Sequence, residues 1–347
     1  MKVLRTAVIG LGRIGWSYHI PEILKNEGFC LVSTADTSLE RRNEMSSKYN
    51  INAYSDYKSM LDSEKLDLIV IASPTVFHME QAVYAMEKGI DVMIDKPMTC
   101  SLDEADRIID VQKMHGRKVM VYQPHRMTPE TLAIKNVMDR NLIGPIYMMK
   151  KALAYYFRRN DWQSLQKFGG GILNNYGAHF IDQLVYLAGS TAEKITSCLK
   201  KVITPGDAED FAKLVMETSN GITLDIDLSW AYSASELDSL VILGKYGSII
   251  SDRTVKGPPE LVVRYLKEDE LPDLPLHGEL AAPGRTYGNN DKLNWHEERI
   301  QVNDFKPVDF YKKCYEYFAL EKQPFVPVVE TRDLMRIIHE CRKAYLE

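Results

Sequence analysis

Lys96 and His179 are the residues whose types and neighbours are best suited to chemistry. Lys96 stands between Asp95 and Pro97 at the end of an apolar run, and the proline fixes the backbone there. A lysine in this place can hydrogen-bond a hydroxyl or carbonyl oxygen and stabilise a developing alkoxide. His179 follows Asn175 by four residues, so a helix would place both side chains on one face. An imidazole can accept a hydroxyl proton near neutral pH. Taken alone, Lys96 also fits a surface lysine, and His179 also fits a core histidine.

A glycine motif near the N-terminus predicts a cradle for a dinucleotide. Gly10, Gly12 and Gly15 have the G-x-G-x-x-G spacing, between an expected strand and an expected helix. The first glycine permits a tight turn, the second lets the backbone approach a pyrophosphate, and the third permits close packing of helix on strand. Asp36 follows about 20 residues later, at the end of the next expected strand, which is the place for a carboxylate that binds the adenosine ribose.

The expected cofactor is NAD rather than NADP, because the Asp36 carboxylate would repel a 2′-phosphate. Arg41 and Arg42 could still reach a phosphate, or they could be solvated helix charges. His78 could contact the cofactor, or it could cap or pack on the helix that follows it. The further cofactor contacts that we expect are Arg13, Ile14, Arg41, Ser73, Pro74, Thr75, His78 and Lys96.

A second glycine cluster, Gly169-Gly170-Gly171, is expected to open the helix that carries Asn175 and His179. Aromatic residues and arginines precede it. Such residues suit a sugar, because rings offer apolar faces and guanidinium groups offer donors to hydroxyls. They also fit a subunit interface or a loop anchor. The expected substrate contacts are His125, Arg126, Tyr155, Arg158, Trp162, Asn175 and His179.

The chain that must position these residues is expected to form two domains. Strands that are almost continuously apolar alternate with helices across residues 1–123, which is typical of a parallel sheet covered on both faces, a Rossmann dinucleotide-binding domain. The expected strands are 4–9, 29–35, 66–72, 90–94 and 118–121, and the expected helices are 14–26, one that begins after Ser38, 76–88 and 102–115.

Residues 124–347 are expected to form a C-terminal α/β domain for substrate binding and oligomerisation, built on a large, open, mainly antiparallel sheet. Its strands are expected from period-2 patterns, and Asn220-Gly221 predicts a hairpin turn. Residues 256–300, rich in Gly, Pro and Asn, are expected to pass over the surface. The other expected elements are strand-like runs at 146–155, 213–218, 222–230 and 241–250, and helices near 129–140, 307–320 and 330–346, the last of which could pack back on the first domain.

Composition excludes several classes of protein. The 347 residues carry a net charge of −5 and no strongly basic segment, which argues against a nucleic-acid partner. The five cysteines form no CxxC or Cys/His spacing, so we expect no metal site and a reducing cytoplasm. No apolar stretch is long enough to span a membrane, and the N-terminal apolar run reads as a strand rather than a signal peptide.

In order and spacing, these motifs resemble the glucose–fructose oxidoreductase / inositol dehydrogenase / rhizopine-catabolism (Gfo/Idh/MocA) family over essentially the whole chain. The matching features are Gly10 to Gly15, Asp36, the turn from Ser73 to His78, Asp95-Lys96-Pro97, Arg126 before Pro129, Gly169 through His179 to Asp182, the Gly244 to Ser248 turn and the closing helix 330–346.

The resemblance implies an NAD(P)-dependent dehydrogenase that moves a hydride between the nicotinamide and a hydroxyl of a sugar, sugar derivative or cyclitol. It implies that Lys96 and His179 contact the reacting hydroxyl, and that subunits form a homodimer or homotetramer through the C-terminal sheet. It also implies an aspartate where this chain has Asn175, which cannot titrate but can orient a hydroxyl or Lys96. Asp95 stands where the family has glutamate.

Two other functions fit the same motifs. Some enzymes that resemble this family hold NAD tightly and cleave a glycosidic bond by transient oxidation and elimination, with no net NADH. A non-catalytic sensor could also keep the fold to bind NAD and a partner protein, although the presence of both Lys96 and His179 argues against it.

Overall fold

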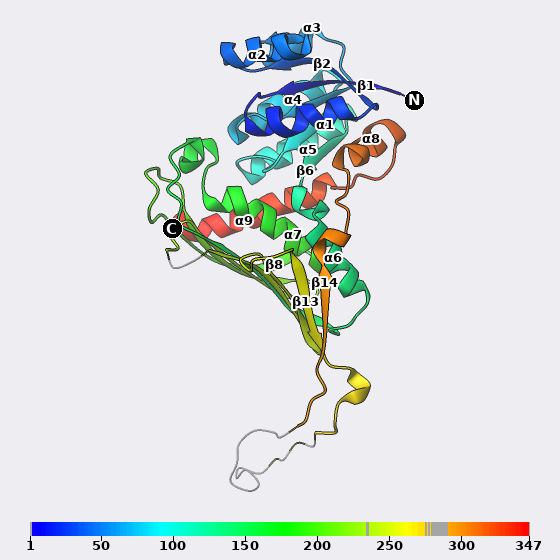
Figure 1. Cartoon of the computed structure of the whole chain (residues 1–347). Coiled ribbons are helices and arrows are strands. Elements are labelled where there is room, and N and C mark those ends of the chain that lie inside the picture. Colours follow the sequence, from blue (N-terminus) through cyan, green and yellow to red (C-terminus); the bar gives the residue numbers. More distant parts are fainter. Residues whose placement is uncertain (1, 234–235, 275, 277, 279–290, 347) are drawn as a thin grey trace.

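Two sheets organise the chain in the computed structural model, which describes residues 2–233, 236–274, 276, 278 and 291–346 (Figure 1). Sheet A is six-stranded and parallel, in the order β3-β2-β1-β4-β5-β6. Its strands are β1 (Leu4–Ile9), β2 (Phe29–Ala35), β3 (Asn52–Tyr54), β4 (Leu68–Ile71), β5 (Asp91–Asp95) and β6 (Val119–Tyr122). This is the Rossmann arrangement that the alternation of apolar strands and helices predicted.

Helices cover both faces of sheet A, because its strands are apolar on both sides; every residue of β4, for example, is buried. They are the π-helical turn η1 (Gly15–His19), α1 (Ile20–Lys25), α2 (Leu39–Tyr49), α3 (Tyr57–Ser63), the short η2 (Thr75–Phe77), α4 (His78–Glu87) and α5 (Leu102–His115). The short β3 and α3 were not predicted. From the far end of the chain, α8 (Phe310–Leu320) also packs here, with Tyr311 and Cys314 in the core around β1 and β4.

Sheet B has eight strands in the order β14-β13-β12-β11-β7-β10-β9-β8, and every pair is antiparallel except β7 with β10. This confirms the predicted large, mainly antiparallel sheet. Its strands are β7 (Ile146–Ala154), β8 (Ala192–Lys200), β9 (Phe211–Thr218), β10 (Thr223–Ser229), β11 (Leu237–Gly244), β12 (Gly247–Asp252), β13 (Glu260–Tyr265) and β14 (His296–Gln301).

Two strand predictions in sheet B were wrong in detail. The run 241–250 is not one strand but the ends of β11 and β12, joined by a turn in which Gly244 pairs with Gly247. Residues 256–300 do not only pass over the surface, since they supply β13 and β14 at one edge of the sheet. Part of that excursion, including residues 279–290, lies outside the described residues.

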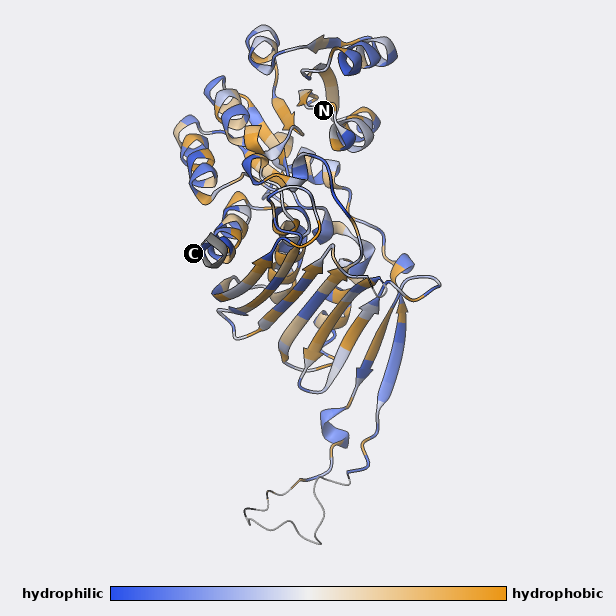
Figure 2. Ribbon diagram, turned by 90° about the vertical axis from the view of Figure 1, so that its left-hand side faces the viewer, coloured by the Kyte–Doolittle hydropathy of each residue, from blue (hydrophilic) through white to orange (hydrophobic). Residues whose placement is uncertain are grey.

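A layer of helices lies between the two sheets (Figure 1). It contains η3 (Pro124–Met127), α6 (Pro129–Asp139), the π-helical turn η6 (Leu173–Gly177), α7 (Ala178–Ala188) and α9 (Val328–Leu346). α9 packs against β8, α5 and α7, and an ion pair joins Arg332 of α9 to Asp106 of α5. In the part of the chain that the structure describes, sheet B therefore has one face covered by helices and one open face, and polar and apolar residues are mixed along its strands (Figure 2). Among the described residues, no helix combines the length and the apolar character needed to cross a membrane.

Candidate active site

The glycine turn after β1 has the shape of a phosphate cradle. Gly10 has φ +96°, and a Cβ there would lie 2.6 Å from the carbonyl oxygen of Ala72. A Cβ on Gly15 would lie 2.0 Å from the carbonyl oxygen of Gly10, whereas a Cβ on Gly12 would meet nothing within 4 Å. The first and third glycines thus permit close packing, and the second faces open space that a pyrophosphate could occupy. The residues present fit a dinucleotide.

Asp36 is fixed where the ribose carboxylate was predicted. Its Oδ2 accepts a hydrogen bond from Leu11 N at 2.7 Å, and its Oδ1 accepts one from Ser38 N at 2.8 Å. Arg41 lies 3.5 Å from Oδ2 and is half exposed. Arg42 instead donates to the backbone carbonyl oxygens of Asp36 and Thr37, so its guanidinium is already bound to the turn.

The His78 side chain is buried and contacts backbone carbonyl oxygens of the protein. Its Nδ1 lies 3.0 Å from the carbonyl oxygen of Pro97 and its Nε2 lies 2.9 Å from that of Ser73. The ring is buried, and burial lowers its pKa. We therefore reassign His78 from cofactor contact to positioning: it ties the turn after β4 to the loop that carries Lys96. The Ser73 hydroxyl likewise donates to Gln81 of α4, and Thr75 is buried.

Lys96 joins the two halves of the site. It follows β5, at the carboxyl edge of sheet A, and its Nζ donates to the backbone oxygen of Asn175 at 3.0 Å and to Oδ1 of Asn175 at 3.4 Å. Burial lowers the pKa of Lys96 to about 8; Asp95 opposes this, while Arg13 and Arg159 add to it. Burial also raises the pKa of Asp95 to about 6.

His179 lies on α7, one turn beyond Asn175, and its ring packs against that of His125 with centroids 4.4 Å apart. Within the described part of the chain, the Nδ1 atoms of both rings are buried without a hydrogen-bond partner. Burial, then Lys96 and His125, hold the pKa of His179 well below its usual value. Burial, followed by Lys151, lowers the pKa of His125 to about 3. Both imidazoles are therefore neutral at physiological pH and can accept a proton or a hydrogen bond.

The second glycine cluster does not open the helix, contrary to the prediction. Gly169 and Gly171 have φ +74° and +108°, and the helix begins after them with the π-helical turn η6. A Cβ on Gly171 would lie 2.1 Å from Oε1 of Glu209. The glycines are needed because the chain turns tightly against buried neighbours before the helix begins. π-helical turns occur frequently at functional sites, and η1 and η6 flank this one.

Arg126 was predicted to bind substrate, but its guanidinium instead binds carboxylates of the protein itself. It is 2% exposed, and its Nε and Nη2 atoms donate to Asp182 at 2.8 and 2.6 Å. It also pairs with Glu330 at the start of α9. We correct its role accordingly: Arg126 ties η3 to α7 and α9, and so holds the helix that carries His179.

The loop after β7 borders the site only in part. Tyr155 is held beside the π-helical turn by a 3.0 Å contact between its hydroxyl and that of Tyr176. Arg159, beside the predicted Arg158, pairs with Asp161 and is one of the charges that lower the pKa of Lys96. Trp162 is half-buried in the same loop, and Arg158 is exposed. Arg13 and Ile14 lie in the glycine turn, with Arg13 exposed.

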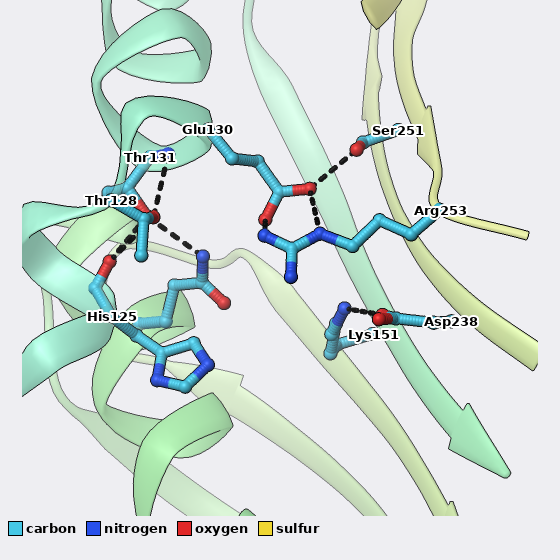
Figure 3. A network of polar contacts seen from close by, with 9 residues as sticks. His125, Thr128, Glu130, Thr131, Lys151, Asp238, Ser251 and Arg253 are labelled. Atoms are coloured by element: carbon cyan, nitrogen blue, oxygen red, sulfur yellow. Dashed lines mark hydrogen bonds and ion pairs between the residues drawn. The ribbon is translucent and has the colours of Figure 1, made fainter. Parts of the chain in front are cut away.

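Sequence reasoning missed a polar network behind the histidines. Lys151 of β7 is 3% exposed and donates to Oδ1 of Asp238 at 2.5 Å. Beside it, Glu130 accepts hydrogen bonds from Arg253 and Ser251 (Figure 3). The alternation of buried and exposed residues along β7 could have indicated that Lys151 points inward, but only once the register was known. In the part of the chain that the structure describes, no group of three or more His, Cys, Asp or Glu residues is arranged to hold a metal ion.

Two family models match the chain, one over sheet A and the other over most strands of sheet B. Residues 4–123 match the model described as "Oxidoreductase family, NAD-binding Rossmann fold", and residues 131–250 match the "GFO/IDH/MocA C-terminal domain".

Two individual relatives have low sequence identity to this chain. D-glucoside 3-dehydrogenase of Escherichia coli is 29% identical over 198 residues, which cover 55% of this chain and 56% of that protein. The scyllo-inositol 2-dehydrogenase (NADP(+)) IolU of Bacillus subtilis is 26% identical over 285 residues, 78% of this chain and 84% of that one.

Two solved structures share the fold along almost the whole chain. An NAD-binding protein from Listeria innocua has a TM-score of 0.83 at 22% identity and covers 99% of this chain and 97% of its own. The WlbA dehydrogenase from Bordetella pertussis, in complex with NADH and UDP-GlcNAcA, has a TM-score of 0.78 at 17% identity, with 99% and 98% covered.

Proposed function

Because this chain belongs to the Gfo/Idh/MocA family of oxidoreductases, we propose that it is a dehydrogenase that transfers a hydride between a sugar, sugar-derivative or cyclitol hydroxyl and NAD. The observation that carries the proposal is the contact between Lys96 Nζ and Asn175, which brings the lysine of sheet A to the helix of His179. We further propose that residues 1–123 form the cofactor domain and residues 124–347 the substrate domain.

Each residue of this site has a role that follows from its chemistry. Lys96 binds the reacting oxygen, and its ammonium stabilises negative charge there. His179 accepts the hydroxyl proton during oxidation and returns it during reduction, since its ring is neutral and its Nδ1 has no hydrogen-bond partner among the described residues. Asn175 positions Lys96 through its backbone oxygen. The nicotinamide, when bound, supplies the hydride acceptor or donor.

The turn after β1 and Asp36 would hold the dinucleotide. Gly12 leaves the backbone open to the pyrophosphate, and the Asp36 carboxylate favours a free ribose hydroxyl over a 2′-phosphate. Arg41 is the residue that would oppose this preference, because it is half exposed and lies beside Asp36.

A sugar-like substrate is supported by the polar groups around His179 and by the names of two relatives, which act on a D-glucoside and on scyllo-inositol. His125, Tyr155 and Trp162 would supply a hydrogen-bonding nitrogen and aromatic surface to such a ring.

The test is a substrate screen with the purified protein and NAD. The panel is D-glucose, D-galactose, methyl β-D-glucopyranoside, myo-inositol, scyllo-inositol and p-nitrophenyl glycosides, with NADH followed by absorbance and products by NMR. We expect NADH and one carbonyl product from at least one polyol. Release of p-nitrophenol without NADH would replace this proposal with glycoside cleavage by transient oxidation, and no reaction with any member would overturn the assignment to sugars.

A further inference from the structure

Lys151 is a buried cation in an apolar part of sheet B. It lies in the middle of β7 with 3% exposure, and its partners across the sheet are Ile226 of β10 and Leu240 of β11, which are 0% and 1% exposed. Placing an ammonium group among such neighbours costs several kcal/mol unless its donors are satisfied. A lysine in this position therefore needs an explanation that packing does not supply.

The contacts of Lys151 satisfy only part of its hydrogen-bonding capacity. Its Nζ donates to Oδ1 of Asp238 at 2.5 Å and lies 4.8 Å from the centroid of the Phe180 ring. An ammonium group has three donors, and Asp238 is its one hydrogen-bond acceptor among the residues that the structure describes.

The neighbouring ion pair is different. Arg253 donates to both carboxylate oxygens of Glu130, which also accepts a hydrogen bond from the Ser251 hydroxyl. That pair is bidentate, as expected of a structural contact, whereas Lys151 beside it has one acceptor for its three donors among the described residues (Figure 3).

The free donors of Lys151 lie close to the histidines of the active site. The Phe180 ring under its ammonium also packs edge-on against His125 at 5.4 Å, and His125 packs against His179 at 4.4 Å. In Figure 3, His125 extends from the helical layer and Lys151 from the sheet toward the same region. Lys151 and Lys96 are both among the charges that act on His125. Lys151 and His125 therefore both pack against the Phe180 ring, and His125 packs against His179.

We propose that Lys151, paired with Asp238, binds a second hydroxyl group of the substrate, distinct from the one that Lys96 and His179 handle. This inference rests on the proposed sugar dehydrogenase activity and adds a residue that determines specificity. A hydroxyl fits better than an anion, because Asp238 already balances the charge of Lys151. A donor next to an acceptor also matches a hydroxyl, which both accepts and donates.

The test measures KM and kcat for Lys151→Met with the polyol of the panel that wild type accepts. We expect KM to rise about 10- to 100-fold, the effect of losing a hydrogen bond to a charged group, with a smaller change in kcat and unchanged NAD binding. A matched control is Lys135→Met, which removes an exposed lysine of α6 from its ion pair with Asp139 and should behave as wild type.

A double variant separates substrate binding from a structural role. Lys151→Met combined with Asp238→Asn removes both charges, so no unpaired carboxylate remains, and it also decides the matter if the single variant folds poorly. We expect its KM to stay high. Monodeoxy analogues of the accepted polyol should identify the hydroxyl. One analogue should bind wild type less tightly than the parent polyol does, but should bind each variant as tightly as the parent polyol does.

The outcomes are distinct. Wild-type KM in Lys151→Met, or recovery of wild-type KM in the double variant, would overturn the role of Lys151 and leave the dehydrogenase proposal intact. If wild type itself oxidises no polyol of the panel, the proposed function fails, and this inference fails with it.

Discussion

In the mechanism that we propose, the chemistry depends on Lys96 and His179, and burial lowers the pKa of both side chains. Burial keeps His179 neutral, so it is ready to accept a proton, while Lys96 keeps its charge up to a pKa of about 8. Asn175 cannot take a proton, but its backbone oxygen holds the ammonium at 3.0 Å. Asn175 can therefore position Lys96 in place of the aspartate that the resemblance implies, and we propose that proton transfer is left to His179.

The pH profile of sugar oxidation should reflect these two groups. We expect no fall of kcat/KM from protonation of His179 on the acid side of pH 7, because burial holds the pKa of His179 well below its usual value. The value of kcat/KM should fall as the pH rises through about 8, where Lys96 loses the proton that stabilises the alkoxide. In Lys96→Arg, any activity that remains should lack this alkaline fall, because a guanidinium stays charged. A loss of rate centred near pH 6.5 in wild type would contradict the neutral histidine.

Asp36 should set the choice of cofactor. Asp36→Ser removes the carboxylate that repels a 2′-phosphate while Arg41 remains beside the site. We expect the ratio of kcat/KM for NAD to that for NADP to fall by at least about tenfold. Asp110→Ser, an exposed aspartate of α5, is the control. An unchanged ratio in Asp36→Ser would remove Asp36 from the cofactor site.

At the scale of elements, the sequence predicted what periodicity can reveal. Apolar runs located β1 and β2 with their observed bounds, and Ser38 caps α2 as expected. The π-helical turns η1 and η6 could not be predicted, because a local widening of a helix leaves no regular pattern.

Side-chain roles were predictable only where one motif defined them. Arg126 and His78 stand in motifs of the family, yet distant partners decide what each side chain does: Asp182 and Glu330 hold one, and the carbonyl oxygens of Pro97 and Ser73 hold the other. Conversely, the burial of Lys151 could not be predicted from the sequence, because it becomes evident only from the register of β7.

The approach to the His179 helix should tolerate no side chain at Gly171. A Cβ there would meet the buried Glu209 carboxylate at 2.1 Å, and φ is +108°. Gly171→Ala should therefore lower the free energy of unfolding by about 2–4 kcal/mol and reduce kcat, because Asn175 and His179 shift with the turn. Gly189→Ala, at φ +62° with nothing within 4 Å, should cost only about 1 kcal/mol and leave kcat unchanged. Denaturant unfolding and steady-state kinetics measure both, and equal effects of the two substitutions would contradict the steric argument.

At the scale of the whole molecule, the site exists only where the two sheets meet. Lys96 comes from sheet A, and His179 from the helical layer on sheet B. Contacts of the layer hold this arrangement, notably Arg332 of α9 with Asp106 of α5. Among the described residues, no helix covers the opposite face of sheet B (Figure 1), and Val215 and Ile250 are exposed there.

We propose that this open face joins subunits into a homodimer or homotetramer. Introducing charge with Val215→Glu and Ile250→Glu together should convert the oligomer to a monomer in light scattering, because two carboxylates would be buried without partners. Val202→Glu, at an exposed position just beyond β8, is the control and should keep the wild-type mass. A monomeric wild type, or a double variant with an unchanged mass, would refute this assembly.

The most direct test of the account compares turnover and cofactor binding in His179→Ala and Lys96→Ala with the polyol that wild type oxidises. Because we propose that the two side chains contact the reacting oxygen and not the pyrophosphate cradle, kcat should fall by about 10²- to 10⁴-fold while NAD still binds. Turnover at the wild-type rate in either variant, with NAD bound, would contradict the assignment of Lys96 and His179 as the catalytic pair.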